Sequence, residues 1–323
     1  MKPVILLIGK TGQVGEELLQ FLPQVGELVA PDRSQMDLSV PNDIRRTIRD
    51  VRPRLIVNAA AYTDVDQAER DETKAWIINA EAPGVIAEEA KAIGAAMVHY
   101  STDYIFDGLK RTAYKELDHP NPINIYGKTK LEGEEAIRSA EISHLIFRTA
   151  WVYATRGRNF LLTILRLATE REELKVVRDQ FGAPAWSREI AVVTSEILSQ
   201  ILAKNSEGSA FSKYCGIYHL TAAGETTWFD FAKAILEDAS RMPQNIPWYA
   251  AATGGRPLIT TRIIPITTKE YPTPASRPAY SVLSNSLLTR TFGIKLQDWP
   301  GQLSLSFATE REALKGFKER SEG

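Results

Sequence analysis

Tyr126 and Lys130, four residues apart, have a spacing suited to proton-transfer chemistry. In a helix this spacing places both side chains on one face. A free phenol has a pKa of about 10. A lysine ammonium about 5 Å away, at an effective dielectric of about 20, favours phenolate by roughly 3 kcal/mol, or about two pKa units. We therefore expect Lys130 to lower the pKa of Tyr126, which becomes a usable general acid or base. An isolated Tyr-Lys pair also occurs by chance on protein surfaces.

Hydroxyl residues precede this pair at the end of an apolar run. Residues 96–101 predict a buried strand, and Thr102 and Asp103 follow it at the carboxyl edge of the expected sheet. Open α/β sheets bind their ligands at that edge. The Thr102 hydroxyl could therefore polarise a substrate oxygen, although a Ser-Thr-Asp sequence by itself is more often a cap or turn.

A glycine-rich turn, G-x-x-G-x-x-G, follows the first apolar run at residues 4–8. Glycines allow the backbone to turn tightly and approach a pyrophosphate, whose charge is stabilised by free N–H groups at a helix N-terminus. A strand followed by this turn and a helix favours a nicotinamide dinucleotide cofactor. We expect the cofactor to contact Gly9, Thr11, Gly12, Gln13, Val14 and Gly15.

Further cofactor contacts are predicted from positions along the sheet. Asp32, about 20 residues beyond the turn, is placed to hold the adenosine ribose, or is only a turn residue. Arg33, together with Lys10, could instead accommodate a 2'-phosphate, so NADH and NADPH both remain candidates. From position alone, Asp37 and Leu38 are expected near the adenine. Two strand ends supply the remaining expected contacts: the small residues Ala59, Ala60 and Ala61 at one, and Tyr100 just before Thr102 at the other.

Alternating apolar runs and helical periods predict an α/β fold with a doubly wound, Rossmann-type parallel sheet. Expected strands are 4–8, 27–31, 55–59, 96–101, 145–149, 175–178 and 216–220, and expected helices are 12–22, 41–51, 65–93, 126–139, 158–172, 187–203, 227–240 and 307–318. Helix 41–51 is expected to be capped by Ser39. We assign 1–165 and 187–240 to the dinucleotide-binding domain, and 166–186 and 241–323 to a smaller substrate-binding domain.

The bulk composition is that of a soluble globular protein. The 323 residues have 44% hydrophobic side chains and a formal net charge of −1, so neither nucleic acid nor an acidic membrane is an expected partner. A single cysteine, Cys215, fits a reducing compartment. The first apolar run is too short to cross a membrane. These features predict a cytoplasmic protein with a small-molecule partner.

Together these motifs resemble the extended short-chain dehydrogenase/reductase family and, within it, the dTDP-4-dehydrorhamnose reductases. The resemblance spans most of the chain. Its motifs are GKTGQVG at 9–15, VNAAA at 57–61, HYSTDY at 99–104, NIYGKTKL at 124–131, FRTAWVY at 147–153, DQFGAP at 179–184 and YPTPASRP at 271–278.

The resemblance implies reduction of a 4-keto sugar nucleotide to dTDP-L-rhamnose with hydride from NADPH or NADH. Tyr126 would be the proton donor, and Lys130 would also hold the nicotinamide ribose. Thr102 and Asp103 would meet the sugar and Trp151 would pack against it. Arg277 is our candidate for the substrate pyrophosphate, because a planar guanidinium pairs well with phosphate.

Two positions depart from the family pattern. Some members bind Mg²⁺ between subunits through glutamates. Glu17 matches one such position, but Arg188 stands where another is expected, which argues against a shared metal. Ala150 replaces a serine often found before the tryptophan, which could soften substrate contacts. Both a monomer and a homodimer remain open.

Two rival functions share these features. A sugar-nucleotide epimerase or 4,6-dehydratase uses the same fold, but a dehydratase usually carries an acid where this chain has Tyr104. A non-catalytic regulatory subunit resembling methionine adenosyltransferase β is the other rival. The intact set of Thr102, Tyr126 and Lys130 favours an enzyme.

Overall fold

The computed structural model describes residues 2–203, 210–243 and 246–308. A six-stranded sheet forms its centre, with the strand order β2-β1-β3-β4-β5-β8 and every neighbouring pair parallel. The strands are β1 (Val4–Ile8), β2 (Glu27–Val29), β3 (Leu55–Asn58), β4 (Ala96–Thr102), β5 (His144–Thr149) and β8 (Gly216–His219). The predicted Rossmann-type sheet is confirmed.

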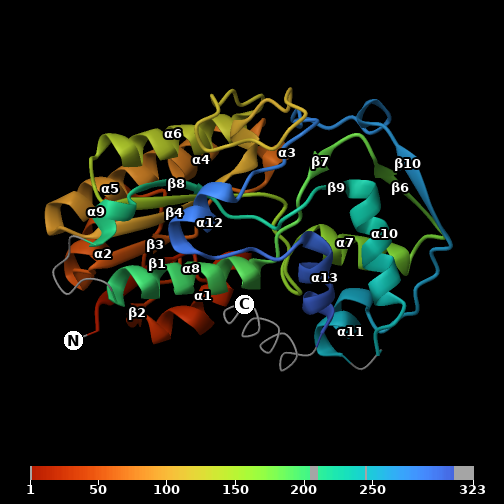
Figure 1. Ribbon diagram of the computed structural model, residues 1–323, viewed down its shortest axis with the longest axis horizontal. Coiled ribbons are helices and arrows are strands. Elements are labelled where there is room, and N and C mark those ends of the chain that lie inside the picture. Colours follow the sequence, from red (N-terminus) through yellow and green to blue (C-terminus); the bar gives the residue numbers. More distant parts are fainter. Residues whose placement is uncertain (1, 204–209, 244–245, 309–323) are drawn as a thin grey trace.

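Helices cover both faces of this sheet (Figure 1). One face carries α1 (Gln13–Phe21), α8 (Ser187–Ala203), α9 (Ala210–Tyr214) and α12 (Ser286–Phe292); the other carries α2 (Pro41–Val51), α5 (Ala82–Ile93) and α6 (Ile125–Ser139). Alternate strand residues point to opposite faces. Accordingly Ile5 and Leu7 pack into the first layer, and Leu6 and Ile8 into the second. Burial on both sides explains why the strands are almost entirely apolar.

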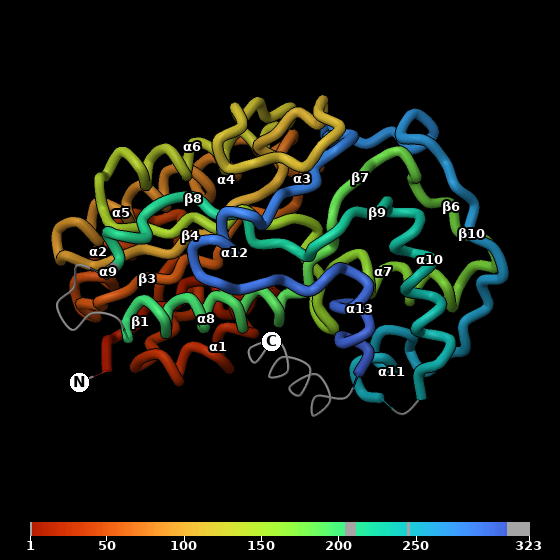
Figure 2. Tube along the Cα trace, viewed as in Figure 1, coloured from red at the N-terminus to blue at the C-terminus, as the bar shows by residue number. Residues whose placement is uncertain are grey.

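A smaller lobe lies beside the sheet (Figure 2). Its helices are α7 (Phe160–Ala168), α10 (Trp228–Ala239), α11 (Pro247–Thr253) and α13 (Trp299–Phe307), and they share a hydrophobic core that includes Leu165, Phe231 and Leu303. Two short sheets complete the lobe, a parallel pair of β6 (Glu173–Val177) with β10 (Arg262–Ile266) and an antiparallel pair of β7 (Phe181–Gly182) with β9 (Thr226–Thr227).

The two cores divide the chain differently from the predicted domain boundaries. Helices α7 and α10 pack in the smaller lobe, although much of α7 and all of α10 fall in ranges assigned to the dinucleotide-binding domain. Conversely α12, assigned to the substrate domain, packs Leu288 and Phe292 against the large sheet. Helical periodicity reveals an apolar face but not the surface that it will cover.

Local helix predictions differ in two places, and a third prediction lies largely outside the described residues. Residues 65–93 form α3 (Val65–Ala68), α4 (Glu72–Trp76), a π-helical turn η2 (Ile77–Glu81) and then α5, whose first turn contains Pro83. The N-cap of α2 is Val40 rather than Ser39. The last described helix, α13, ends at Phe307, and most of the predicted helix 307–318 lies outside the described residues. Within the described ranges, no helix is long and apolar enough to span a membrane.

Candidate active site

The glycine-rich turn lies where β1 and β3 are neighbours and the strand order changes direction, the usual place for a ligand in such sheets. A Cβ on Gly9 (φ +89°) would lie 2.6 Å from the Ala60 nitrogen, and one on Gly15 would lie 2.0 Å from the Gly9 oxygen. Gly12 is different, because its Cβ would meet nothing closer than 3.4 Å. Two glycines are thus required by the packing of the protein itself, whereas a Cβ on Gly12, at the N-terminus of α1, would make only ordinary van der Waals contacts. This arrangement fits a dinucleotide pyrophosphate.

The predicted ribose and adenine residues form an exposed cluster after β2. The Asp32 carboxylate accepts hydrogen bonds from the backbone and hydroxyl of Ser34, as a turn residue would. Its other oxygen lies 3.9 Å from Lys10 Nζ. Arg33 is 74% exposed and pairs with Asp37 at 3.3 Å. A carboxylate and a guanidinium therefore lie together, and either could meet the adenosine ribose. Leu38, by contrast, is buried in the core.

Tyr126 lies in the first turn of α6, directly above the end of β4. Asn124 caps the helix by accepting a 2.7 Å hydrogen bond from the Gly127 nitrogen. A Cβ on Gly127 would lie 2.2 Å from the Tyr104 oxygen, so this glycine allows α6 to approach η3 (Asp103–Ile105) closely. The Thr102 side chain is close enough to the Tyr126 phenol to oppose the rise of the phenol's pKa. The role of Thr102 in orienting a substrate oxygen stays a prediction.

The protonation of Tyr126 differs from the expectation. Burial raises the pKa of Tyr126 to about 12, the nearby Thr102 side chain opposes this rise, and the charge of Asp103 adds to it. The spacing to Lys130 predicted a lowered pKa. The prediction was wrong in direction for the protein alone, because desolvation of the phenolate outweighs other effects. A phenol with this pKa carries its proton at neutral pH.

Lys130 is buried, with 1% of its surface exposed, and its ammonium nitrogen is held from two sides. Nζ donates a 2.6 Å hydrogen bond to the Tyr100 carbonyl and lies 3.1 Å from His99 Nε2. Burial lowers the pKa of Lys130 to about 8, although Glu134 opposes this shift. His99, the first residue of the HYSTDY motif at 99–104, was not among the predicted site residues. The predicted cofactor residue Tyr100 offers its carbonyl here, while its hydroxyl bonds Thr194 on α8.

Buried polar groups surround Thr102 at the carboxyl ends of β4 and β5. The Thr102 hydroxyl donates to Asp103 Oδ1 at 3.1 Å. Burial raises the pKa of Asp103 to about 6. The hydroxyls of Ser101 and Thr149 are buried without a hydrogen-bond partner among the described residues. A buried hydroxyl without a partner in the protein usually bonds water or a ligand. The Ser101 and Thr149 hydroxyls therefore mark this edge of the sheet as a binding site.

Trp151, the predicted sugar contact, takes a left-handed backbone conformation (φ +47°). Its ring stacks on Trp228 with centroids 3.5 Å apart and planes 8° from parallel. A Cβ on Gly182 would lie 2.3 Å from the Trp151 ring. Trp228 and Gly182 come from β9–α10 and β7, so the smaller lobe positions this side chain. Spacing along the sequence contains no signal for this contact.

Comparison with known proteins agrees with this geometry. The family model described as the RmlD substrate binding domain matches residues 1–311. A dTDP-4-dehydrorhamnose reductase of Burkholderia thailandensis is 48% identical over 295 residues, covering 91% of this chain and 95% of the relative. The chain belongs to the dTDP-4-dehydrorhamnose reductase family. The predicted family is confirmed.

Two further family members are similar over nearly the same length. The dTDP-4-dehydrorhamnose reductase of Escherichia coli K12 is 43% identical, covering 91% of this chain and 94% of the relative. A crystal structure of dTDP-4-dehydrorhamnose reductase from Bacillus anthracis in complex with NADP superimposes with a TM-score of 0.83 at 30% identity, covering 95% and 99% of the two chains. The members that this chain resembles are thus oxidoreductases.

A shared Mg²⁺ was not expected, because Arg188 stands where the family pattern has a second glutamate, and the surroundings of Glu17 bear on this point. The Glu17 carboxylate pairs with Arg156 at 2.9 Å and with Arg188 at 3.0 Å. Two guanidinium groups therefore flank Glu17, the one glutamate that matches a metal-binding position of the family. Across the residues that the structure describes, no group of three or more His, Cys, Asp or Glu side chains could hold a metal. These residues do not fit a divalent cation.

Arg277, our candidate for the substrate pyrophosphate, already forms an ion pair and several hydrogen bonds within the protein. Its Nη2 lies 2.7 Å from Asp66, and its Nη1 donates to Asp66, to Thr273 and to the Ala275 carbonyl. Asp66 also accepts from the Ala275 nitrogen, so this pair ties the loop before Arg277 to α3. Both terminal nitrogens already have acceptors. The role in pyrophosphate binding stays a prediction.

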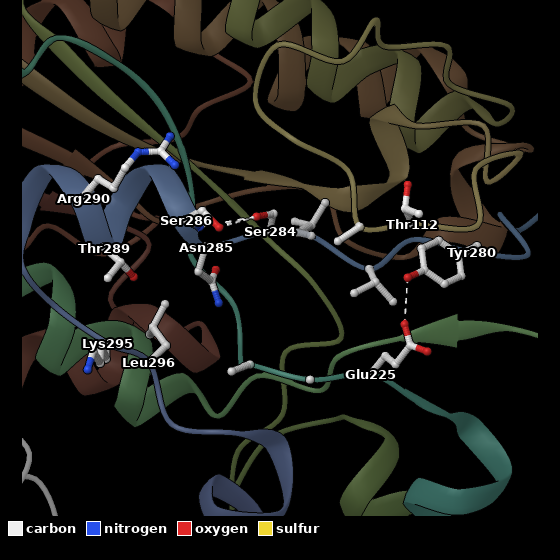
Figure 3. A pocket seen from close by; sticks show the side chains of 15 residues that line it. Thr112, Glu225, Tyr280, Ser284, Asn285, Ser286, Thr289, Arg290, Lys295 and Leu296 are labelled. Atoms are coloured by element: carbon white, nitrogen blue, oxygen red, sulfur yellow. Dashed lines mark hydrogen bonds between the residues drawn. The ribbon is translucent and has the colours of Figure 1, made fainter.

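A cavity of about 940 Å³ lies beside α12 and contains none of the predicted site residues (Figure 3). Arg290, Lys295 and several hydroxyls line one end, and Tyr280 donates a 2.7 Å hydrogen bond to Glu225 at the other. The neighbouring Ser281 is buried, and its nitrogen donates to the Phe181 carbonyl at 2.8 Å.

Proposed function

We propose that the chain reduces dTDP-4-dehydro-6-deoxy-L-mannose to dTDP-L-rhamnose with NADPH or NADH, in the last step of dTDP-rhamnose synthesis. Family membership supports this reaction and substrate. The observation that carries the proposal is the position of the Tyr126 phenol in the first turn of α6, near Thr102 at the ligand-binding edge of the sheet, where burial raises its pKa to about 12 and keeps it protonated. Such a phenol is suited to donate a proton.

The bound nicotinamide would supply a hydride to C4 of the keto sugar. The Tyr126 hydroxyl donates its proton to O4, so the C=O group becomes CH–OH and Tyr126 is left as a phenolate, which solvent reprotonates. The Thr102 hydroxyl, which is near the phenol, would orient the same oxygen. Trp151, fixed by Trp228, supplies a flat apolar wall of the kind that packs against a sugar ring. Lys130 would hold the nicotinamide ribose.

Turnover with the purified substrate tests the proposal. We expect NAD(P)H consumption by the wild type and a loss of at least 100-fold in kcat for Tyr126→Phe, the usual order for a removed acid. Tyr218→Phe is a matched control, because it also removes one buried phenol oxygen, which donates to the Tyr214 carbonyl on the other side of the sheet. Absence of turnover in the wild type would refute the reductase function, and full activity of Tyr126→Phe would refute its role.

A further inference from the structure

A short segment between β5 and α7, residues 154–159, lies against the glycine-rich turn. Asn159 Nδ2 donates a 3.0 Å hydrogen bond to Gln13 Oε1 in the first turn of α1. Arg156 pairs with Glu16, also in that first turn, at 2.6 Å. The segment is therefore fixed to the end of α1 at which we expect the cofactor pyrophosphate.

The chain that follows β3 also contacts the turn. A Cβ on Gly9 would lie 2.6 Å from the Ala60 nitrogen, so the turn and the residues just after β3 touch each other. Asp64, four residues beyond Ala60, caps α3 by accepting a 3.1 Å hydrogen bond from the Gln67 nitrogen. The turn therefore has two neighbours, the segment 154–159 and the loop that leads from β3 to Asp64.

Arg158 connects these two neighbours of the turn. A Cβ on the preceding residue, Gly157, would lie 4.0 Å from Gln13 Cγ, so the backbone here runs beside the first turn of α1. The Arg158 guanidinium lies 3.8 Å from the Asp64 carboxylate at the N-cap of α3. The side chain thus extends from the first turn of α1 to α3, next to the place where the turn would hold a pyrophosphate.

Other cations near the turn already have partners in the protein. Lys10 Nζ donates a 2.9 Å hydrogen bond to the Ala30 carbonyl, just after β2, where the adenosine is expected. Arg156 and Arg188 pair with Glu17 at 2.9 and 3.0 Å. To bind a pyrophosphate, each of these cations would have to give up a close contact.

Arg158 can move at little cost. Its side chain is 92% exposed and its contact with Asp64 is long, and exposed ion pairs of this kind contribute little to stability. Asp64 keeps the Gln67 N–H group as a partner when Arg158 leaves. A pyrophosphate offers charged oxygens that a planar guanidinium binds through two parallel hydrogen bonds.

We propose that Arg158 binds the pyrophosphate of the nicotinamide dinucleotide, and that its guanidinium leaves Asp64 for the phosphate oxygens when the cofactor enters. The free N–H groups at the N-terminus of α1 would hold the same pyrophosphate, and Arg158 would add a full positive charge to them. The inference rests on the proposed function, because it takes a nicotinamide dinucleotide as the cofactor. It concerns binding and can be measured without turnover.

The test is fluorescence titration of the full-length protein with NADH and with NADPH, and calorimetric titration with ADP-ribose. Arg158→Gln removes the charge of an exposed side chain, so the unfolding temperature should stay close to that of the wild type. We expect the Kd to rise about 10-fold for each of the three ligands, because all three contain the pyrophosphate. The affinity for NADH should also depend less on salt in the variant, since one ion pair with the cofactor is lost.

Arg166→Gln is the matched control. Arg166 lies on α7 in the smaller lobe, is also exposed, at 54%, and pairs with the Glu170 carboxylate at 3.0 Å. The substitution makes the same change of net charge away from the glycine-rich turn. We expect this variant to bind all three ligands with the affinity of the wild type.

Wild-type affinity for NADH in Arg158→Gln would overturn the proposal. A loss confined to NADPH would overturn it too, because Arg158 would then meet the 2'-phosphate, and a loss that spares ADP-ribose would place Arg158 at the nicotinamide half of the cofactor. An equal loss in Arg166→Gln would reduce the effect to one of net charge and would also overturn the proposal. Wild-type protein that binds the ligands as described but shows no turnover would refute the reductase function and leave the inference about Arg158 standing.

Discussion

Asp103 follows β4 with its carboxyl group buried beside Thr102. Burial disfavours the charged form, and the resulting pKa of about 6 lies above the ordinary value of 3.8, even with hydrogen bonds that oppose the shift. The folded protein therefore binds this proton more tightly than the unfolded chain does. The stability contributed by the protonated group is complete below pH 3.8 and is lost as the pH rises through 6.

Replacing Asp103 with Asn should remove this pH-dependent loss. A shift of about two pKa units corresponds to about 3 kcal/mol, so the variant should gain roughly this much relative to the wild type between pH 4 and pH 7. Urea unfolding of both proteins across this range measures the difference. Parallel stability curves would show that the Asp103 carboxyl is not desolvated as described.

At the scale of elements, the turn between β1 and α1 combines two kinds of glycine. Gly15 is required by close packing, because its Cβ would overlap the Gly9 carbonyl at 2.0 Å, whereas Gly12 has room for a methyl group at 3.4 Å. Gly15→Ala should therefore lower the free energy of unfolding by about 3 kcal/mol, since the backbone must shift. Thermal unfolding and urea denaturation report this change.

Gly12→Ala should separate folding from cofactor binding. The added methyl group clashes with no protein atom, so the unfolding temperature should stay close to that of the wild type. It would stand where we expect the pyrophosphate to approach, and NADPH affinity should fall at least 10-fold. Fluorescence titration with NADPH measures this. Wild-type affinity in Gly12→Ala would place the cofactor elsewhere.

At the scale of the whole molecule, Glu17 joins three segments that are far apart in the sequence. Its carboxylate lies on α1, Arg156 belongs to the segment after β5, and Arg188 lies on α8. Glu17→Gln would leave two guanidinium groups without their shared anion. We expect a loss of about 2 kcal/mol, less than for a fully buried pair because Arg156 stays partly exposed. Urea unfolding measures this loss.

The same contacts of Glu17 predict that Mg²⁺ affects neither the stability nor the activity of the protein. Because guanidinium groups surround Glu17, EDTA or added Mg²⁺ should change neither the unfolding temperature nor the turnover of the wild type. Scanning calorimetry and the reductase assay, each run with chelator and with added metal, check this. Activity lost on chelation and restored by Mg²⁺ would contradict it.

The fold followed closely from local sequence patterns. The seven predicted strands are present, because runs such as Leu55–Asn58 must be buried on both faces and can form only interior strands. The 9–15 turn was also predictable, since glycine spacing after a strand is a local property. The division between lobes was not predictable in detail, as α7, α10 and α12 show. The apolar face of an amphipathic helix does not specify which surface the helix will pack against.

For the site, the sequence by itself placed Tyr126 and Lys130 on one helix, α6, and Thr102 at the end of β4. Their protonation was decided by the tertiary structure alone. Burial reversed the expected pKa shift of Tyr126, and His99 and the Tyr100 carbonyl reached Lys130 from β4. Spacing along a helix specifies neighbours on one face, whereas desolvation and contacts across a sheet depend on segments that are distant in the chain.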